Sequence, residues 1–174
     1  MKIVLIEPLS VDLAVIERLA RPWRAAGHSF VAYDSRAEDP AELRRRAGDA
    51  DIVLEGNQPL PAEMLRQLSA CRYLSVGFSG IDHVDAETAR QMGITVSNSA
   101  GYADDSVAEL ALGMMLSLLR NIGPADAACK AGRTKDGLVG RELCGKTVGI
   151  VGMGACGCRL AEILQVFGCR VIFY

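Results

Sequence analysis

Short apolar runs alternate with stretches of helical periodicity along roughly the first 100 residues of the chain. The runs carry hydrophobic residues at consecutive positions, a pattern typical of strands that helices cover on both faces. The expected strands are residues 2–7, 29–34, 51–56, 72–77 and 94–98. The periodicity of the intervening stretches predicts helices over residues 11–26, 41–47, 61–69 and 84–92.

This order of elements predicts an α/β fold. Connections that contain a helix join parallel strands by right-handed crossovers. Residues 1 to about 102 are therefore expected to form one doubly wound domain around a parallel sheet. Ligands of such sheets bind outside the carboxyl ends of the strands, which directs attention to loops 55–59, 76–85 and 97–106.

The next expected element is a long helix over residues 103–120. Its first residues include Asp104, Asp105 and Ser106, whose side chains are of the types that cap helix N-termini. Its body is apolar nearly all round, which predicts a buried helix. The polar stretch 121–145 is broken by glycines and is expected to be an excursion between two domains.

From residue 146 onward the strand–helix pattern begins again around a glycine-rich turn. A strand is expected over 147–151, a helix over 155–167 and a second strand over 170–174. The turn reads GMGACG and fits the pattern G-x-G-x-x-G between a strand and a helix. In a dinucleotide site Gly152 would allow a sharp turn, Gly154 would let a pyrophosphate approach, and Gly157 would let helix and strand pack closely. A purely structural glycine turn is the alternative.

Composition and charge narrow the function classes. The formal net charge of -2 and the pI of about 5.7 give no electrostatic footprint for nucleic acid. The N-terminal apolar run is too short for a signal peptide or a membrane span, so a cytoplasmic protein without a membrane partner is expected. No metal site is expected either, because Cys156 and Cys158 would diverge on the first turn of a helix.

The loop that contains Gly77, Ser79 and Gly80 allows two interpretations. Its backbone N–H groups could form a small nest that binds a carboxylate at the start of a helix near Asp82. The same glycines could instead serve only the geometry of a tight strand-to-helix turn. The residues alone do not decide between them.

Three motifs in order, VGFSGIDHVDAETARQMGITVSNSAGYADDSVAELALGMMLSLLRNI, LCGKTVGIVGMGACG and FGCRVIFY, resemble the D-isomer-specific 2-hydroxyacid dehydrogenase family. The resemblance covers almost the whole chain. It implies a flavodoxin-like parallel-sheet substrate domain over 1–102 and a connecting helix and excursion over 103–145. Residues 146–174 would then be the start of a Rossmann domain that binds NAD or NADP, with NAD preferred, in a chain that forms homo-oligomers.

The resemblance also implies roles for individual residues. Ser79 and Gly80 match the loop whose backbone amides hold the substrate carboxylate, and Asn57 lies on the facing loop. Ser106 matches a position near the nicotinamide. The residues that match the pyrophosphate loop are Gly152, Gly154, Ala155, Cys156 and Gly157.

Three departures from the family pattern set further expectations. The family's catalytic Arg, acid and His find no match in residues 1–174, so no catalytic residue is assigned, and the chain is expected to be truncated and inactive by itself. Glu55 stands where phosphoglycerate-oxidising members carry an Arg, which argues for a small 2-oxo or 2-hydroxy acid instead. Two strands and one helix are also too few to cover the apolar faces of a cofactor domain.

Two hypotheses about function follow. In the first, the chain is the front part of a hydroxyacid dehydrogenase that moves hydride between NAD(P)H and C2 of a 2-oxo acid. In the second, it is a non-catalytic module that binds a carboxylate or pairs with another subunit.

Overall fold

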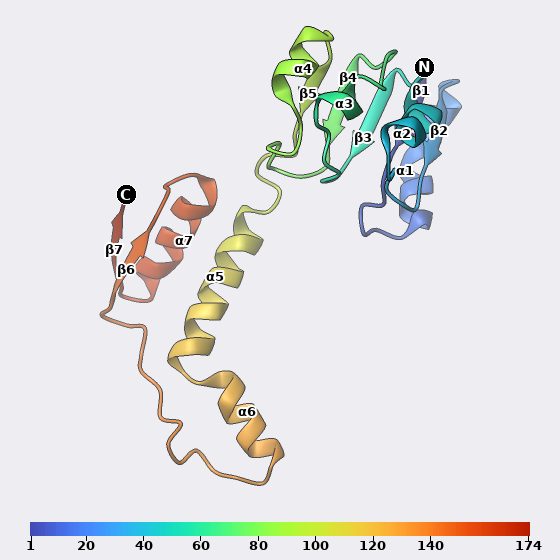
Figure 1. Cartoon of the computed structure of the whole chain (residues 1–174). Helices are drawn as coiled ribbons and strands as arrows, with labels where there is room; N and C mark the ends of the chain where they lie inside the picture. The colour runs from blue at the N-terminus through green and yellow to red at the C-terminus, as the bar shows by residue number, and fades with distance from the viewer. The chain divides into compact units, whose positions relative to one another are not determined.

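The computed structural model describes residues 1–174 and divides into two compact units, Met1–Ala100 and Gly101–Tyr174. The first unit is built around a parallel sheet with strand order β2-β1-β3-β4-β5, as Figure 1 shows. This is the flavodoxin-like order, so the predicted fold class is confirmed. The strands are β1 (Lys2–Leu5), β2 (Ser29–Ala32), β3 (Ile52–Glu55), β4 (Tyr73–Val76) and β5 (Thr95–Ser97).

Four helices connect these strands, and aspartates cap three of them. The helices are α1 (Leu13–Ala25), α2 (Pro40–Ala47), α3 (Ala62–Leu65) and α4 (Ala86–Gln91). The carboxylates of Asp12, Asp39 and Asp85 each accept a hydrogen bond from a backbone N–H in the following turn, at 2.7 to 2.9 Å. Such caps satisfy donors that have no partner inside the helix, which explains where these helices begin.

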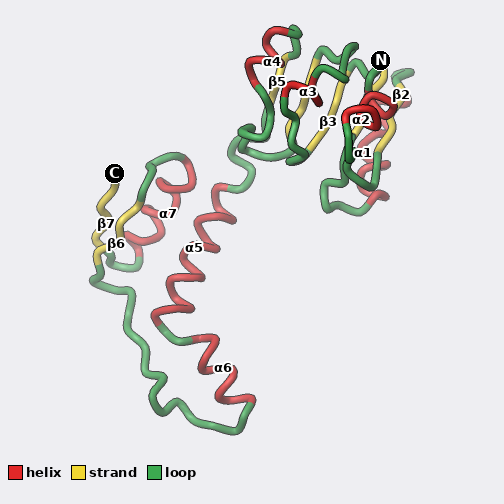
Figure 2. The backbone as a smooth tube through the Cα atoms, in the orientation of Figure 1, coloured by secondary structure: helices red, strands yellow, loops and turns green.

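The two faces of this sheet are covered unequally (Figures 1 and 2). Under α2, α3 and α4, fully buried side chains such as Val53, Leu65 and Leu74 form the larger core. Burial of each large apolar side chain stabilises the fold by roughly 1.5–3 kcal/mol. On the other face α1 covers only part of the sheet, and beside it Leu54 and Tyr73 line an open groove.

The unequal cover has a topological cause. The chain steps from β1 to β2 in one direction and then through β3, β4 and β5 in the other. Since right-handed crossovers change faces when the direction changes, α1 lies opposite α2, α3 and α4. We expected helices to cover both faces of every strand. This is correct for the face under α2, α3 and α4, but on the face of α1 no helix covers β4.

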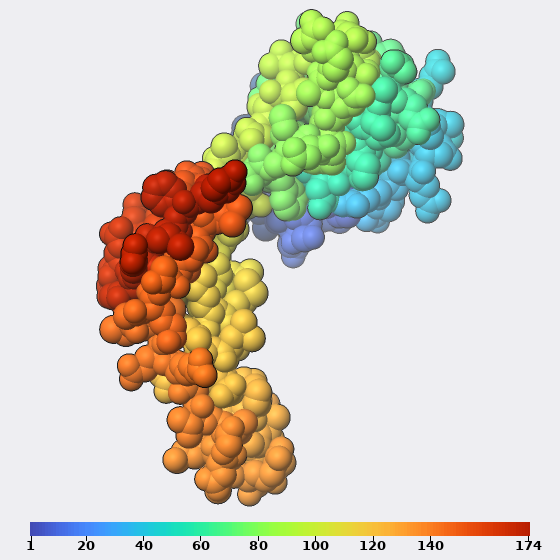
Figure 3. Space-filling model, turned by 60° about the vertical axis from the view of Figure 1, so that its left-hand side comes forward, coloured from blue at the N-terminus to red at the C-terminus, as the bar shows by residue number.

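The second unit contains α5 (Asp104–Leu119), α6 (Ile122–Lys130), β6 (Thr147–Ile150), α7 (Ala155–Val166) and β7 (Arg170–Phe173). The strands β6 and β7 pair in parallel, from Thr147 opposite Arg170 to Ile150 opposite Phe173. Leu143, Ile150, Ala161 and Leu164 form the core, with one side of α5 packed against it. Phe173 and Tyr174 are exposed. The C-terminal end of the chain is coloured red in Figure 3.

The structure departs from the sequence expectations for this unit at two points. The helix α5 is not buried all round, because Leu110, Met114 and Leu118 are more than half exposed while Ala108 is buried. The excursion 121–145 contains the helix α6, which Asn121 separates from α5 by adopting a left-handed conformation with φ of 53°. The structure thus groups 103–145 in one compact unit with 146–174.

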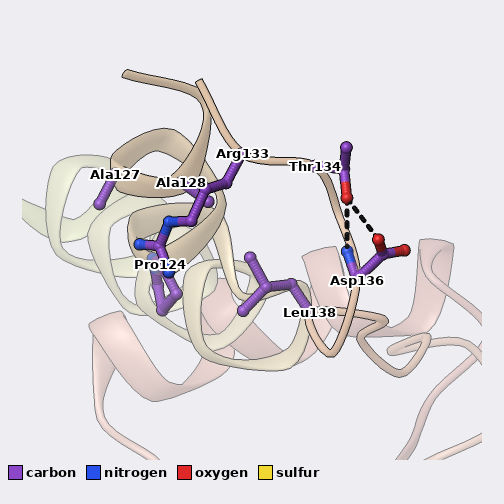
Figure 4. Close-up of a pocket in the computed structure, with 7 residues that line it drawn as sticks. All are labelled: Pro124, Ala127, Ala128, Arg133, Thr134, Asp136 and Leu138. Atoms are coloured by element: carbon purple, nitrogen blue, oxygen red, sulfur yellow. Dashed lines mark hydrogen bonds between the residues drawn. The ribbon is translucent and has the colours of Figure 1, made fainter. Parts of the chain in front are cut away.

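A hollow lies between α6 and the loop that follows it, as Figure 4 shows. The side chain of Arg133 reaches back toward Pro124, while Leu138 closes the other side. On the rim, the Thr134 hydroxyl and the Asp136 carboxylate are hydrogen-bonded at 2.6 Å. None of the residues that the sequence assigns to a ligand lines this hollow. No helix of the chain is both long enough and apolar enough to span a membrane.

Candidate functional site

The loops that follow β3 and β4 meet at the carboxyl edge of the first unit's sheet. A Cβ atom built on Gly56 would lie 3.0 Å from the Phe78 ring, so the two loops are in contact there. Beyond that contact the Leu60 N–H donates to the His83 carbonyl at 2.8 Å. The structure therefore brings Asn57, which is exposed on the first loop, close to the second loop.

Ser79 and Gly80 lie exposed on the second loop. Their backbone N–H groups donate to no acceptor within the chain. The loop is held from behind, because the Asn98 side-chain amide donates to the Ser79 carbonyl at 2.6 Å. The helix α4 begins only at Ala86, so the expected helix start near Asp82 is wrong and these amides belong to a loop.

A buried carboxylate supports the first loop from below. Glu7, just after β1, is 1% exposed. Its Oε1 accepts the backbone N–H groups of Gly56, Asn57 and Gln58 at 2.7, 2.7 and 2.6 Å. Its Oε2 accepts from Nε of Arg36 at 2.6 Å. Burial by itself would raise the pKa of Glu7, but these donors outweigh it and lower the pKa, so the group is ionised.

A second buried carboxyl, that of Glu55 at the end of β3, has the opposite behaviour. Burial, followed by the neighbouring negative charge of Glu7, raises the pKa of Glu55 to about 8. Its Oε1 is 2.8 Å from Nε2 of His83, and its Oε2 has no hydrogen-bond partner. A proton on Glu55 relieves the main cost, because it removes a second buried negative charge beside Glu7.

This geometry corrects one argument from the sequence. Glu55 was expected to face the substrate and to repel a phosphate, but its side chain is buried and neutral near pH 7. It therefore gives no reason to exclude a phosphorylated substrate. The cation that does lie beside the candidate loop is Arg36, whose side chain is half exposed and whose Nη2 donates to Oδ1 of Asn57.

In the second unit, the glycine-rich turn has the geometry that the motif requires. Gly152 has a φ of +90°, which favours glycine, and it makes the sharp turn after β6. A Cβ on Gly154 would meet open space, whereas a Cβ on Gly157 would lie 2.3 Å from the Gly152 carbonyl oxygen. The first turn of α7, which carries Ala155 and Cys156, follows directly. Its free N–H groups and the helix dipole favour an anion there.

The first turn of α5 lies beside this glycine turn. Cys156 Sγ is 3.5 Å from Oδ1 of Asp104, and Nε of Arg159 is 2.5 Å from Oδ1 of Asp105. Ser106 directly follows Asp105, which contacts Arg159 of α7. The expected capping is wrong, because the N-cap residue of α5 is Ala103 and no side chain caps the helix.

The cysteines of the chain are all free. Cys156 and Cys158 share the first turn of α7, as expected. Partial burial, followed by the contact with Asp104, raises the pKa of the Cys156 thiol. No cluster of three or more His, Cys, Asp or Glu side chains has the geometry of a metal site.

Comparison with known protein families places the chain in one of them. The profile of the D-isomer specific 2-hydroxyacid dehydrogenase family, catalytic domain, matches residues 3–167. The chain belongs to this family. The resemblance read from the three sequence motifs is thereby confirmed.

Relatives in the D-isomer specific 2-hydroxyacid dehydrogenase family include a glyoxylate/hydroxypyruvate reductase, HPR3, from Arabidopsis thaliana. It is 36% identical over 138 residues, which make up 77% of this chain and 43% of that protein. A D-3-phosphoglycerate dehydrogenase from Methanocaldococcus jannaschii is 30% identical over 176 residues, or 99% of this chain and 32% of that protein. The chain thus spans less than half the length of these curated relatives.

Solved structures of the same fold hold nicotinamide cofactors. The acyclic imino acid reductase Bsp5, in complex with NADPH and D-Arg, matches with a TM-score of 0.87 at 26% identity. The match covers 99% of this chain and 55% of that one. A 3-phosphoglycerate dehydrogenase of Entamoeba histolytica, bound to NAD+, matches with a TM-score of 0.78 at 28% identity and covers 100% and 53% of the two chains.

Sequence reasoning missed the supporting residues of the first loop, Glu7 and Arg36. One signal was present, because two strand patterns, KIVLIE and DIVLE, each end on a glutamate at the carboxyl edge of the sheet. The strands β1 and β3 are neighbours in the sheet. Their two glutamates must therefore lie close to each other or face solvent. Nothing in the sequence showed that Arg36, after β2, would contact Glu7 and Asn57.

Proposed function

We propose that residues 1–174 supply the substrate loops and the pyrophosphate loop of an NAD(P)-dependent D-2-hydroxyacid dehydrogenase. The observation that supports this best is the glycine turn, where each glycine meets a different requirement of a dinucleotide site. Gly152 has a positive φ, Gly154 leaves space for a ligand, and Gly157 leaves no room for a side chain.

In this proposal the nicotinamide cofactor, when bound, supplies or accepts the hydride at C2 of a small 2-oxo or 2-hydroxy acid. The N–H groups of Ala155 and Cys156 receive the pyrophosphate, helped by the dipole of α7. Ser106 lies toward the nicotinamide, on the first turn of α5. NAD is the first cofactor to test and NADP the second, since the structural relatives described above hold one of each.

The substrate carboxylate is received by the exposed amides of Ser79 and Gly80, with Asn57 on the facing loop. These loops fit a small acid such as glyoxylate or hydroxypyruvate, which appear in the name of the Arabidopsis relative. Because Glu55 is buried and neutral near pH 7, 3-phosphoglycerate belongs among the substrates to be tested.

Neither histidine of the chain is free to act as the catalytic acid and base. His28 lies 3.4 Å from the N-terminal amine, and His83 is hydrogen-bonded to the buried Glu55. A general acid must reach the oxygen that it protonates. We infer that residues 1–174 alone bind ligands without turnover, and that the active enzyme, a homo-oligomer, uses an Arg, an acid and a His outside them.

The test measures cofactor binding and turnover separately. The 174-residue polypeptide is titrated with NADH and with NADPH by nicotinamide fluorescence, next to the Gly154→Ala variant, whose added Cβ has space in the folded chain. Binding that the variant weakens about tenfold, with no oxidation of NADH by glyoxylate, hydroxypyruvate or pyruvate, is expected. The protein isolated from its own cells is assayed in parallel and should oxidise NADH with one of these acids.

Two outcomes would contradict the proposal. Turnover by the 174-residue polypeptide would show that the catalytic groups lie within it. Binding of a carboxylate without binding of either cofactor would instead support a non-catalytic carboxylate-binding module.

A further inference from the structure

The side chain of Asn57 is the exposed polar group on the first substrate loop, and two other residues determine how it lies. Glu7 holds the loop backbone and Arg36 contacts the Asn57 side chain itself. We propose that Glu7 and Arg36 are positioning residues that hold Asn57 with its N–H donors turned toward the substrate. This inference rests on the proposed function, since it assigns a task within the same candidate site.

Three successive backbone N–H groups of the loop are bonded to Glu7. One carboxylate oxygen accepts from Gly56, Asn57 and Gln58 together, at distances between 2.6 and 2.7 Å. Bonds to an ionised acceptor are stronger than neutral ones. Because the three donors converge on one atom, the loop cannot rotate any of these peptide groups without losing a bond to a buried charge.

The contact with Arg36 also determines the orientation of the Asn57 side-chain amide. A guanidinium group has donors only, whereas an Asn side chain has one acceptor oxygen and one donor nitrogen. Contact with Arg36 therefore requires Asn57 to turn Oδ1 toward Arg36, as found. Nδ2 is then left for another partner, and its two N–H groups suit a carboxylate or a carbonyl oxygen.

Arg36 itself is held by the buried carboxylate. Its side chain is 50% exposed and would be mobile without a partner. The bond from Nε to Glu7, at 2.6 Å, joins it to a group that is 1% exposed, so this ion pair is less screened than a surface pair. Glu7 thus acts on Asn57 twice, directly through the backbone and indirectly through Arg36.

The test compares variants of the full chain labelled with ¹⁵N. Glu7→Gln keeps the shape of the side chain but removes its charge, and Arg36→Met removes the contact to Asn57. The matched controls are Glu87→Gln and Arg90→Met, which break an exposed Glu–Arg pair on α4. Amide hydrogen exchange, the side-chain N–H signals of Asn57 and the affinity for oxamate, an analogue of a 2-oxo acid, are measured for each.

In Glu7→Gln, exchange of the Gly56, Asn57 and Gln58 amides is expected to accelerate on the order of 10- to 100-fold, with the strand amides unchanged. In Arg36→Met, backbone exchange should hold, while the two Asn57 side-chain signals shift and the Kd for oxamate rises about tenfold. Both control variants should behave as the unmodified chain does.

The inference is overturned if Glu7→Gln leaves the three loop amides unchanged or accelerates exchange equally in the strands, since the role would then be general stability. It is also overturned if Arg36→Met changes neither the Asn57 signals nor the affinity for oxamate. Failure of the proposed function looks different. Oxamate would then leave the signals of Ser79 and Gly80 unmoved in the unmodified chain, while the exchange data and the Asn57 signals would still decide whether Glu7 and Arg36 hold the loop.

Discussion

Replacement of Glu55 by Gln should make the first unit less sensitive to alkaline pH. The pKa of Glu55 is about 8 in the folded chain, against an ordinary value of 4.5. Between these values the folded state holds a proton that the unfolded state has released, so the free energy of unfolding falls as pH rises. The contribution of protonated Glu55 to the free energy of unfolding is fully present below pH 4.5. It is lost as the pH rises through about 8.

The magnitude follows from proton linkage. One proton of difference changes the free energy of unfolding by about 1.4 kcal/mol per pH unit. Between about pH 5.5 and 7.5 the stability of Glu55→Gln relative to the unmodified chain should therefore increase by roughly 2–3 kcal/mol. Gln resembles the protonated acid in shape and can still accept from His83.

The assay is urea unfolding at several pH values, followed by the fluorescence of the single tryptophan. Trp23 lies on α1 with its ring centre 5.6 Å from that of Phe30, so it reports on the first unit. Glu87→Gln on the exposed face of α4 is the matched control, because the pKa of Glu87 is lowered by its bond to Arg90 and the group does not titrate in this range. Parallel curves for Glu55→Gln and the unmodified chain would refute a protonated Glu55.

Three further predictions concern packing and capping. Gly157→Ala places a Cβ 2.3 Å from a backbone oxygen and should destabilise the second unit by about 1–3 kcal/mol in chemical unfolding followed by circular dichroism; an unchanged midpoint would contradict the tight turn. Leu164→Ala removes a side chain with 0% exposure and should cost about 2–5 kcal/mol in the same experiment, whereas Val166→Ala, at an 88% exposed position, should cost little. Asp85→Ala removes the bond to the Thr88 N–H, and a loss of about 1 kcal/mol by tryptophan fluorescence is expected; no loss would mean that water replaces the cap.

The fold of the first unit was predictable because several independent signals in the sequence indicate the same fold. The apolar runs, the aspartates before the helices and the lengths of the connections all favour a parallel α/β sheet. The glycine turn was predictable for the same reason, since its pattern stands between a strand and a helix. The side-chain network at the sheet edge was not, because it joins Glu7, Arg36, Glu55 and His83 across large separations in the sequence.

The errors in the second unit have local physical causes. Apolar residues all round α5 suggested complete burial, but in residues 101–174 only one side of the helix has a neighbouring layer. The helix α6 was not predicted, because the stretch 121–145 is polar and broken by glycines. Gly123 and Pro124 occupy its first turn, where a proline lacks only an N–H that has no helical partner.

The place of Glu7 in the strand order has a consequence for how the fold accommodates ligands. In a sheet ordered β2-β1-β3-β4-β5, the crevice where neighbouring connections leave in opposite directions opens between the carboxyl ends of β1 and β3. Here Glu7, just after β1, places its own carboxylate there, against three N–H groups that follow β3. The carboxylate of Glu7 thus occupies the position in which sheets of this strand order commonly bind a ligand. A ligand carboxylate must therefore bind to N–H donors farther out on the loops. Within the crevice, Glu7 holds the loop that follows β3 in place.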